Sequence, residues 1–215
     1  MDTVVARQQM VDQQVRTWEV LDPRVLRALG AVERERFVPE AYRDVAFADA
    51  PIPIGHGQSL LAPKLHGRIL QALELEPGSS ALEIGTGTGY LSACLGLLAA
   101  GVRTLEVHAA LAAIARSNLR GCPGSITVET ADALATDLGG PWDAIAVTAS
   151  LPRYDARFEQ ALSVGGRLFV VVGAAPVMEA TLVRRMSATA FARESLFETV
   201  IEPLEGAAPI SRFVF

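Results

Sequence analysis

A short glycine-rich segment carries the strongest chemical signal in the chain. Residues 82–90 read LEIGTGTGY, in which strand-forming residues lead directly into three glycines at alternate positions. Glycines at a strand-to-helix turn let the backbone approach a ligand closely, whereas a turn that binds nothing gains no benefit from their entropic cost. The segment therefore predicts a ligand-binding turn.

The spacing of the glycines and the acid beside them narrow the class of ligand. Dinucleotide-binding turns follow the pattern Gly-x-Gly-x-x-Gly, but here Gly89 comes one residue early and Tyr90 occupies the expected glycine position. Glu83 lies at the end of the preceding strand, where its carboxylate would repel a pyrophosphate. The same carboxylate could hold the ammonium of a methionine moiety, directly or through water. A cationic ligand is thus favoured over NAD.

Two further acids follow the next predicted strands. Glu106 ends the segment TLEV, about twenty residues beyond the glycines, where a carboxylate can accept hydrogen bonds from both ribose hydroxyls of a nucleoside. Asp132 follows the third predicted strand and could bind an adenine amino group. Each acid alone is equally typical of a surface or capping residue. As a series with Glu83, they indicate S-adenosylmethionine.

Three histidines are candidates for a general base, which methyl transfer to a hydroxyl or an amine would need. His56 lies in a glycine-containing loop near the front of the chain and is the candidate of the three. His66 is expected within a helix, and His108 follows Glu106 near the cofactor end. For each of the three, a surface or packing role is the commoner one. A histidine base is therefore a hypothesis, and transfer to a carboxylate would not need such a base.

The elements that would position these residues alternate between strand and helix from Pro63 onward. Strands that alternate with helices predict a parallel sheet with helices on both faces. The predicted parallel strands are 81–84, 102–107, 126–128, 144–147 and 168–172. Two last extended segments, 180–186 and 191–201, surround a small-residue turn and predict an antiparallel pair at the sheet edge.

The region before Pro63 has a different character. Apolar positions recur at heptad-like spacing over residues 4–18 and predict an amphipathic helix. Asp22 and Pro23 mark the start of a second short helix, which Gly30 would end in the left-handed conformation. Residues 45–63 contain three prolines and two glycines and are expected to form a loop folded over something.

These patterns divide the chain into two regions that form one compact unit. Residues 1–62 are predicted to be a helical cap with a substrate loop, and residues 63–215 a cofactor-binding core. The fold class is α/β, with a mostly parallel, doubly wound sheet.

Composition limits the possible partners of this chain. Its 215 residues include 50% hydrophobic and 20% charged residues, which is typical of one globular domain and not of a disordered chain. The formal charge of -5, with Lys64 the one lysine, makes nucleic acid an unexpected partner. The longest apolar stretch, 91–102, is too short for a membrane span, and the first residues do not resemble a signal peptide. We therefore expect a cytoplasmic protein with no membrane partner.

The cysteines give no indication of a disulfide framework or a zinc site. Cys94 and Cys122 lie in apolar or turn contexts without neighbours typical of metal ligands. No metal is expected.

At the level of the whole chain, the sequence resembles the protein-L-isoaspartate O-methyltransferase family, a branch of the class I S-adenosylmethionine-dependent methyltransferases. The glycine turn is similar to the family's EIGTGSGY, and other shared motifs occur in family order. These are FVP at 37–39, PIGHGQ at 53–58, WDAIAVTA at 142–149 and EPL at 202–204. The resemblance implies a Rossmann-like methyltransferase fold and methyl transfer to the carboxylate of isoaspartyl residues in damaged proteins, a repair reaction.

The resemblance also implies a cofactor site made of the glycine turn and the acids that follow the strands. Its members, carried over by position, are Glu83, Gly85, Thr86, Gly87, Glu106, Asp132 and Ala133.

One departure from the family falls where the acceptor would bind. The family usually has Gly-Gln-Thr-Ile-Ser, and this chain has GQSLL at 57–61, so Leu61 stands where the family places a hydroxyl beside the reacting carboxylate. A carboxylate is already ionised near neutral pH and needs alignment and no base, although a lost hydrogen bond to a charged group costs roughly 1.5 to 3 kcal/mol. Ser59 could supply the missing hydroxyl.

Two alternatives follow from Leu61. One is a divergent methyltransferase with another acceptor, such as a small molecule. The other is a cofactor-binding regulatory protein that has lost catalysis.

Overall fold

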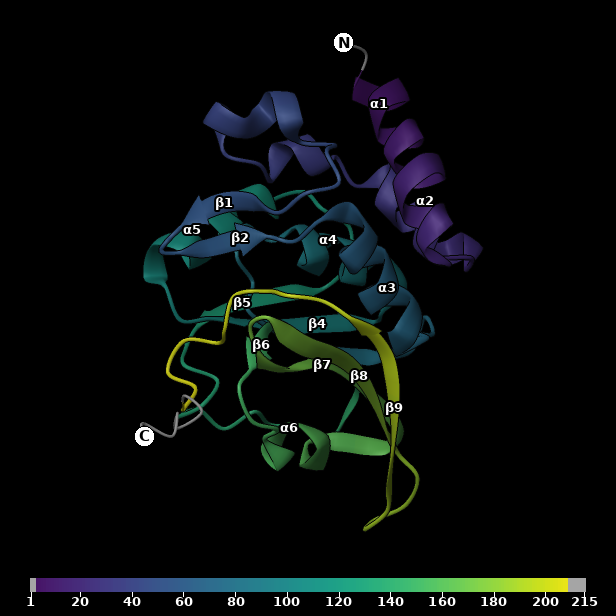
Figure 1. Ribbon diagram of the computed structural model, residues 1–215, viewed down its shortest axis with the longest axis vertical. Helices are drawn as coiled ribbons and strands as arrows, with labels where there is room; N and C mark the ends of the chain where they lie inside the picture. The colour runs from purple at the N-terminus through teal and green to yellow at the C-terminus, as the bar shows by residue number, and fades with distance from the viewer. Residues whose placement is uncertain (1–2, 209–215) are drawn as a thin grey trace.

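A seven-stranded sheet forms the centre of the protein, whose computed structural model describes residues 3–208 (Figure 1). The strand order is β5-β4-β3-β6-β7-β8-β9, with parallel pairing from β5 to β7 and antiparallel pairing at β7–β8 and β8–β9. The strands are β3 (Ser80–Ile84), β4 (Gly101–Glu106), β5 (Ile126–Thr130), β6 (Trp142–Leu151), β7 (Leu162–Ala174), β8 (Val177–Arg185) and β9 (Phe191–Glu198). The predicted parallel sheet with an antiparallel edge is confirmed.

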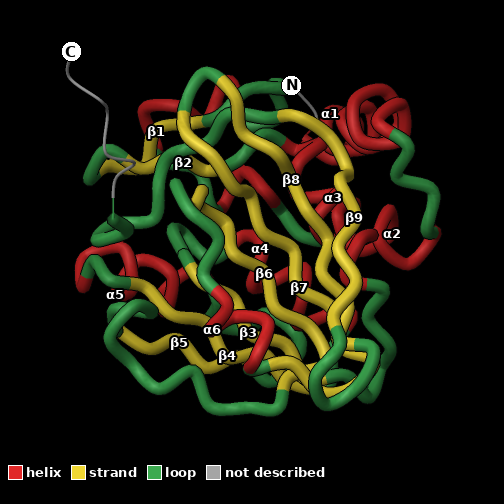
Figure 2. The backbone as a smooth tube through the Cα atoms, turned by 60° about the horizontal axis from the view of Figure 1, so that its bottom comes forward, coloured by secondary structure: helices red, strands yellow, loops and turns green. Residues whose placement is uncertain are grey.

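Apolar side chains on both faces of the sheet explain why it is covered on both sides. In β3 and β6, alternate residues belong to two different buried clusters: Ala81 and Ala144 to one, Leu82 and Ile145 to the other. The helices of this region are α3 (Pro63–Leu73), α4 (Tyr90–Leu98), α5 (Ala109–Asn118) and α6 (Ala156–Gln160). The tube view shows α4 and α6 on opposite faces of the sheet (Figure 2).

The sheet order also fixes where a ligand can bind. The chain winds outward from β3 to β4 and β5, and then returns to place β6 on the other side of β3. At such a reversal the connections leave the carboxyl ends of adjacent strands in opposite directions and open a crevice between them. The crevice of this protein therefore lies beyond the ends of β3 and β6.

The region before β3 begins with two helical segments. Helix α1 (Thr3–Met10) continues through a wide π-helical turn (Val11–Val15) and a 3-10 turn (Arg16–Trp18), so the predicted helix over 4–18 is helical throughout but changes its pitch.

Helix α2 (Pro23–Ala31) starts as predicted, because Asp22 accepts a hydrogen bond from the backbone nitrogen of Arg24 at 2.7 Å. The predicted end at Gly30 is wrong. The helix passes through Gly30 to Ala31 and ends where Val32 becomes extended, which requires no left-handed residue.

The loop expected over residues 45–63 is partly wrong as well. A 3-10 helix (Glu40–Val45) leads into a two-stranded hairpin of β1 (Ile52–Gly55) and β2 (Gln58–Leu60). Prolines usually interrupt strands, but Pro53 lies in an isolated two-stranded ribbon, where a missing N–H is tolerated.

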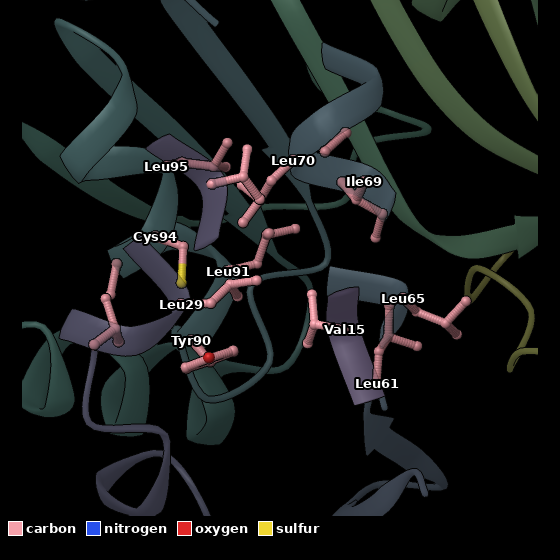
Figure 3. Close-up of a cluster of buried hydrophobic side chains, with 14 of the residues drawn as sticks. Val15, Leu29, Leu61, Leu65, Ile69, Leu70, Tyr90, Leu91, Cys94 and Leu95 are labelled. Carbon is pink, nitrogen blue, oxygen red and sulfur yellow. The ribbon is translucent and has the colours of Figure 1, made fainter. Parts of the chain in front are cut away.

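The N-terminal helices share a buried cluster with α3 and α4 (Figure 3). Val15 and Leu29 lie in this cluster with Leu70 and Leu91. Gly67 of α3 allows the close approach, because a Cβ there would lie 2.6 Å from Cγ1 of Val15. The division of the chain at residue 62 stays a prediction.

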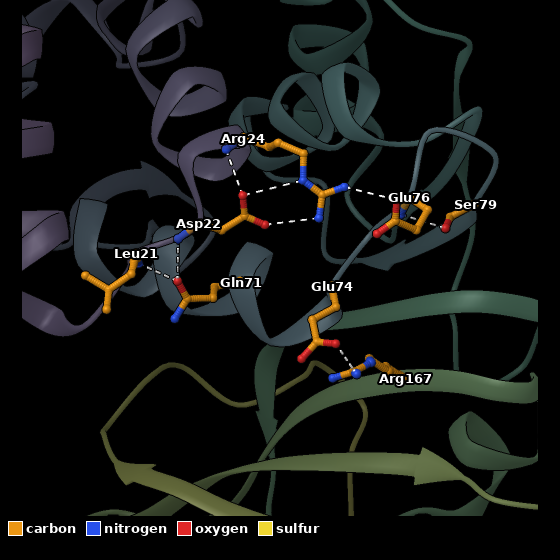
Figure 4. A network of polar contacts seen from close by, with 8 residues as sticks. All are labelled: Leu21, Asp22, Arg24, Gln71, Glu74, Glu76, Ser79 and Arg167. Atoms are coloured by element: carbon orange, nitrogen blue, oxygen red, sulfur yellow. Dashed lines mark hydrogen bonds and ion pairs between the residues drawn. The ribbon is translucent and has the colours of Figure 1, made fainter.

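Polar contacts also join the N-terminal region to the core (Figure 4). The side-chain oxygen of Gln71 in α3 accepts hydrogen bonds from the backbone nitrogens of Leu21 and Asp22. Arg24 pairs with Asp22 and Glu76, so the start of α2 is held against the loop before β3.

Within residues 3–208, no helix is long and apolar enough to cross a membrane.

Candidate active site

A cleft with about 640 Å³ of empty space lies at the carboxyl ends of the parallel strands. We call it the cofactor cleft. Its base comes from the glycine turn and the strand ends, and its rim from the β1–β2 hairpin and the segment after β9. The lining includes Gly85, Gly87, Glu106, Asp132, Ala133 and Thr148 at the base, and Ile54, Ser59, Glu202 and Glu205 at the rim.

The glycine turn follows β3 with left-handed backbone at Gly85 and Gly87, whose φ angles are +92° and +54°. A Cβ at Gly85 would lie 2.4 Å from Oγ1 of Thr148, so the turn passes directly under the end of β6. Thr148 donates to the carbonyl oxygens of Ile84 and Gly85 at 2.9 and 2.8 Å and fixes that contact. Glycine is therefore required here by both conformation and space.

Glu106 clamps the turn to the end of β4. One carboxylate oxygen accepts from the backbone nitrogen of Gly87 at 2.8 Å and the other from that of His108 at 3.0 Å. The side chain is buried, yet it lines the cleft. A carboxylate has about four acceptor positions, so each oxygen can take a further hydrogen bond. This geometry suits a pair of neighbouring hydroxyls such as those of a ribose.

Asp132 and Ala133 lie beyond the end of β5 at the far side of the cleft. One oxygen of Asp132 accepts from the backbone nitrogen of Leu134 at 2.8 Å, which holds the carboxylate in place. Ala133 is buried and, with Leu111, gives this end of the cleft an apolar wall. A flat base with an exocyclic amino group fits these surroundings.

A second, smaller cavity, which we call the inner cavity, continues from the cofactor cleft. Ile54, Ser59, Gly85, Gly87 and Thr148 line both spaces, so they surround the junction between them. The inner cavity is otherwise lined by buried side chains, among them Leu61, His66, Glu83, Thr86, Thr88 and Tyr90. Together the two spaces form a bent channel.

Three side chains that line the inner cavity have a buried polar atom without a hydrogen-bond partner among the described residues: Oε1 of Glu83, Oγ1 of Thr88 and the hydroxyl oxygen of Tyr90. An unsatisfied buried polar group costs about 1–3 kcal/mol, so such atoms in a cavity point to a missing ligand. A carboxylate oxygen and a hydroxyl suit the ammonium and carboxylate of a methionine moiety. The channel thus fits S-adenosylmethionine, with the nucleoside in the cleft and the amino acid in the inner cavity.

The surroundings of Glu83 keep its charge sensitive to pH. Burial raises the pKa of this carboxyl to about 7, although the hydroxyls of Ser92 and Thr104 donate to one of its oxygens and oppose the rise. Near neutral pH the group is therefore divided between the neutral and ionised forms. Thr86 is also tied inward, since its hydroxyl lies 2.6 Å from that of Thr104.

The two residues predicted near the acceptor, Leu61 and Ser59, differ in whether their side chains can form a hydrogen bond. Leu61 is buried in the apolar cluster of Figure 3 and offers no hydrogen-bonding side chain. Its backbone oxygen accepts from the buried guanidinium of Arg34 at 2.8 Å. Ser59 does bring a hydroxyl to the channel, and this hydroxyl donates to Oε1 of Glu202 at 2.6 Å.

The structure does not bring His56 into the cofactor cleft. His56 is exposed at the tip of the hairpin, with φ of +54°, and its ring stacks on that of His108 at 4.3 Å between centroids. His108 lines the cleft, and its Nε2 lies 2.6 Å from a carboxylate oxygen of Glu205.

His66 has a packing role. It is buried, its Nδ1 lies 3.3 Å from Arg34, and burial together with the Arg34 charge lowers its pKa well below the usual value.

Three residues of the channel were missed by the sequence reasoning. Thr148 follows the fourth parallel strand's apolar run, so the rule that strand ends bind ligands could have found it. Thr88 lies within the glycine turn itself. Glu202 belongs to the shared EPL motif, but nothing in the sequence indicated that it lies beside Ser59, because 143 positions separate the two residues. Over residues 3–208, no group of three or more His, Cys, Asp or Glu side chains is arranged to hold a metal ion.

Comparison with known proteins gives consistent results for sequence and fold. Residues 5–206 match the family model described as protein-L-isoaspartate(D-aspartate) O-methyltransferase (PCMT). A protein-L-isoaspartate O-methyltransferase of Koribacter versatilis is 39% identical over 204 residues, which cover 93% of this chain and 90% of that protein. One of Aeropyrum pernix is 35% identical over 207 residues, covering 94% and 80% respectively.

The fold is shared with a crystal structure of a Plasmodium falciparum protein in complex with S-adenosyl-L-homocysteine, described as a putative protein-L-isoaspartate O-methyltransferase. Its TM-score is 0.79 at 19% identity, with 93% of this chain and 98% of that chain covered. The family match spans nearly the whole chain, and the relatives exceed 30% identity over most of their length. The chain therefore belongs to the protein-L-isoaspartate(D-aspartate) O-methyltransferase family.

Proposed function

We propose that this protein transfers a methyl group from S-adenosylmethionine to the carboxylate of isoaspartyl residues in polypeptides. The observation that carries the proposal is the bent channel, whose cleft suits a nucleoside and whose inner cavity holds unpartnered atoms of Glu83 and Thr88. Relatives of similar length and up to 41% identity are named for this activity. The alternatives of another acceptor or a purely regulatory role rest on Leu61 alone, and the family match does not favour them.

In this proposal the cofactor cleft holds the nucleoside of the cofactor and the inner cavity holds its amino acid. Glu106 accepts hydrogen bonds from the ribose, Asp132 and Ala133 contact the adenine, and Glu83 faces the ammonium. When bound, the cofactor supplies an electrophilic methyl group on a sulfonium. The junction between cleft and inner cavity, beside Ser59, is where that methyl group would face the acceptor.

The chain needs no general base for a carboxylate acceptor, which agrees with the exposed position of His56. A carboxylate is ionised at neutral pH, so the protein must desolvate and align it rather than remove a proton. Ile54 and Leu61 provide apolar surface at the junction and on the inner cavity wall, and they would exclude water from the reacting groups. The acceptors are proposed to be damaged proteins or peptides of the cytoplasm.

The proposal is tested with labelled S-adenosylmethionine and two peptides that are identical except for one isoaspartyl or normal aspartyl residue. We expect transfer of label to the isoaspartyl peptide and none to its aspartyl twin. Binding of the cofactor is measured in parallel by calorimetry. Cofactor binding without transfer to any isoaspartyl peptide would contradict the proposal.

The variant Leu61→Ser is expected to raise kcat/KM for the isoaspartyl peptide by about tenfold, since a hydrogen bond to a charged group contributes roughly 1.5–3 kcal/mol. It should also lower the free energy of unfolding by about 2–4 kcal/mol, because Leu61 is buried in the apolar cluster. Steady-state kinetics and urea unfolding measure the two effects. Leu61→Ala controls for the loss of packing, and an equal gain in rate with alanine would exclude a role for the hydroxyl.

Cofactor affinity is expected to depend on pH through Glu83. The cofactor's ammonium pairs with the ionised carboxylate, whose pKa of about 7 makes that form scarce at lower pH. Affinity should therefore fall by about tenfold between pH 7.5 and pH 6, since one proton must be released on binding. Calorimetry at both pH values measures this change. In Glu83→Gln the affinity should be lower and nearly constant over the same range, and an unchanged pH dependence in that variant would disprove the assignment.

A further inference from the structure

A third space, which we call the outer groove, adjoins the channel. The groove has about 920 Å³ of empty space between the residues on either side of the hairpin, the start of α3, the β7–β8 turn and the segment after β9. Leu61 lines both the groove and the inner cavity, and Glu202 lines both the groove and the cofactor cleft. A polypeptide in the outer groove would thus lie beside the junction where the methyl group is presented.

The walls of the outer groove are mostly apolar, with contributions from Pro51, Leu65, Met178 and Val200. An apolar groove of this size suits a short extended stretch of polypeptide better than a small polar acceptor. Its position next to the junction identifies the occupant as the segment that carries the isoaspartyl residue.

The charges around the outer groove do not cancel. Lys64 and Asp49 form an ion pair at 2.7 Å, and the Lys64 ammonium also lies over the ring of Trp18. Glu202 is half-buried and forms no ion pair with any cation in residues 3–208. The Ser59 hydroxyl donates a hydrogen bond to Oε1 of the Glu202 side chain, which leaves Oε2 available.

We propose that Glu202 determines acceptor specificity by favouring isoaspartyl segments with a cationic side chain next to the isoaspartyl residue. The inference rests on the proposed function of the same site. An acceptor carboxylate at the junction and Glu202 would carry like charges, so they would repel each other unless a cation pairs with Glu202. A lysine or arginine beside the isoaspartyl residue pairs with Glu202, whereas an acidic neighbour adds a further repulsion.

The test uses the intact protein and isoaspartyl peptides that differ at one position, with lysine, glutamine or glutamate directly before or directly after the isoaspartyl residue. On at least one side, kcat/KM should be about five- to tenfold higher for lysine than for glutamate, as expected for partly exposed charges. The ratio should shrink in 1 M salt, where such interactions are screened.

Three variants separate specificity from stability. In Glu202→Gln the lysine-to-glutamate ratio should fall below about twofold, and in Glu202→Lys it should invert. Glu194→Gln is the matched control, because it removes an equal charge from an exposed site on β9 and should keep the native ratio.

The outcomes distinguish this inference from the function on which it rests. A native protein that methylates all the peptides equally, or a ratio that Glu202→Gln leaves unchanged, would overturn the role of Glu202 alone. Absence of transfer to every isoaspartyl peptide, with cofactor binding intact, would overturn the proposed function and this inference together.

Discussion

Replacing Glu106 by alanine is expected to weaken cofactor binding by at least about a hundredfold. Two ribose hydrogen bonds to a carboxylate, at roughly 1.5–3 kcal/mol each, account for a loss of this size. The substitution also removes the acceptor for the backbone nitrogens of Gly87 and His108, so the glycine turn loses one of its hydrogen bonds to β4. Titration calorimetry with S-adenosyl-L-homocysteine measures the effect without the reaction.

A matched control is available on the neighbouring strand. Glu129 of β5 pairs with Arg103 at 2.8 Å and is not among the residues that line the cofactor cleft. Glu129→Ala should change cofactor affinity by less than about twofold, although it can lower stability slightly. If Glu106→Ala bound the ligand within threefold of the native protein, Glu106 could not be the ribose-binding residue.

Substitution of Gly85 by alanine is expected to lower the free energy of unfolding by about 2–4 kcal/mol. The φ angle of +92° strains any residue with a Cβ, and that Cβ would lie 2.4 Å from Oγ1 of Thr148. The change should be measured by urea denaturation in the absence of cofactor.

Two comparisons identify the cause of this loss. Gly78→Ala is the control, since a Cβ there meets nothing within 4 Å and its φ is not left-handed; it should change stability by less than about 0.5 kcal/mol. In a Thr148→Ala background, the Gly85→Ala substitution should be less destabilising, because the overlap is gone and the backbone strain is left. An equal loss in both backgrounds would mean that the contact with Thr148 contributes nothing.

Much of the fold was predictable from the sequence because local patterns and long-range packing agree in the core. Most of the parallel strands contain a short apolar run. The helix α3 begins with Pro63, whose fixed backbone conformation suits the first helical position. Gly30 shows where local rules are insufficient. It carries a strong stop signal, but the helix continues for one more residue and ends where Val32 becomes extended.

The residues of the candidate site likewise include some that the sequence predicts and some that it does not. Glu106, Asp132 and the glycine turn were predictable because the carboxyl ends of parallel strands meet at one edge of a sheet. The proximity of Glu202 to Ser59 was not, since it depends on how the segment after β9 returns beside β6, where Pro203 bridges to Ser150. The hairpin that places Ser59 at the rim was also missed, and with it the exposed position of His56.

Buried Arg34 places a positive charge close to the inner cavity. Its guanidinium has neutral partners, among them the carbonyl oxygens of Ala46 and Leu61, so its positive charge is not cancelled by a neighbouring carboxylate. It lies directly behind His66 and Tyr90 on one side of the cavity, and Glu83 lies in the wall of the same cavity. A positive charge and a carboxylate, the two poles of this cavity, therefore lie near a small space among buried side chains, where charges interact strongly. Such a cavity discriminates in favour of a zwitterion, and a ligand that carried the ammonium without the carboxylate would match only one of the two poles.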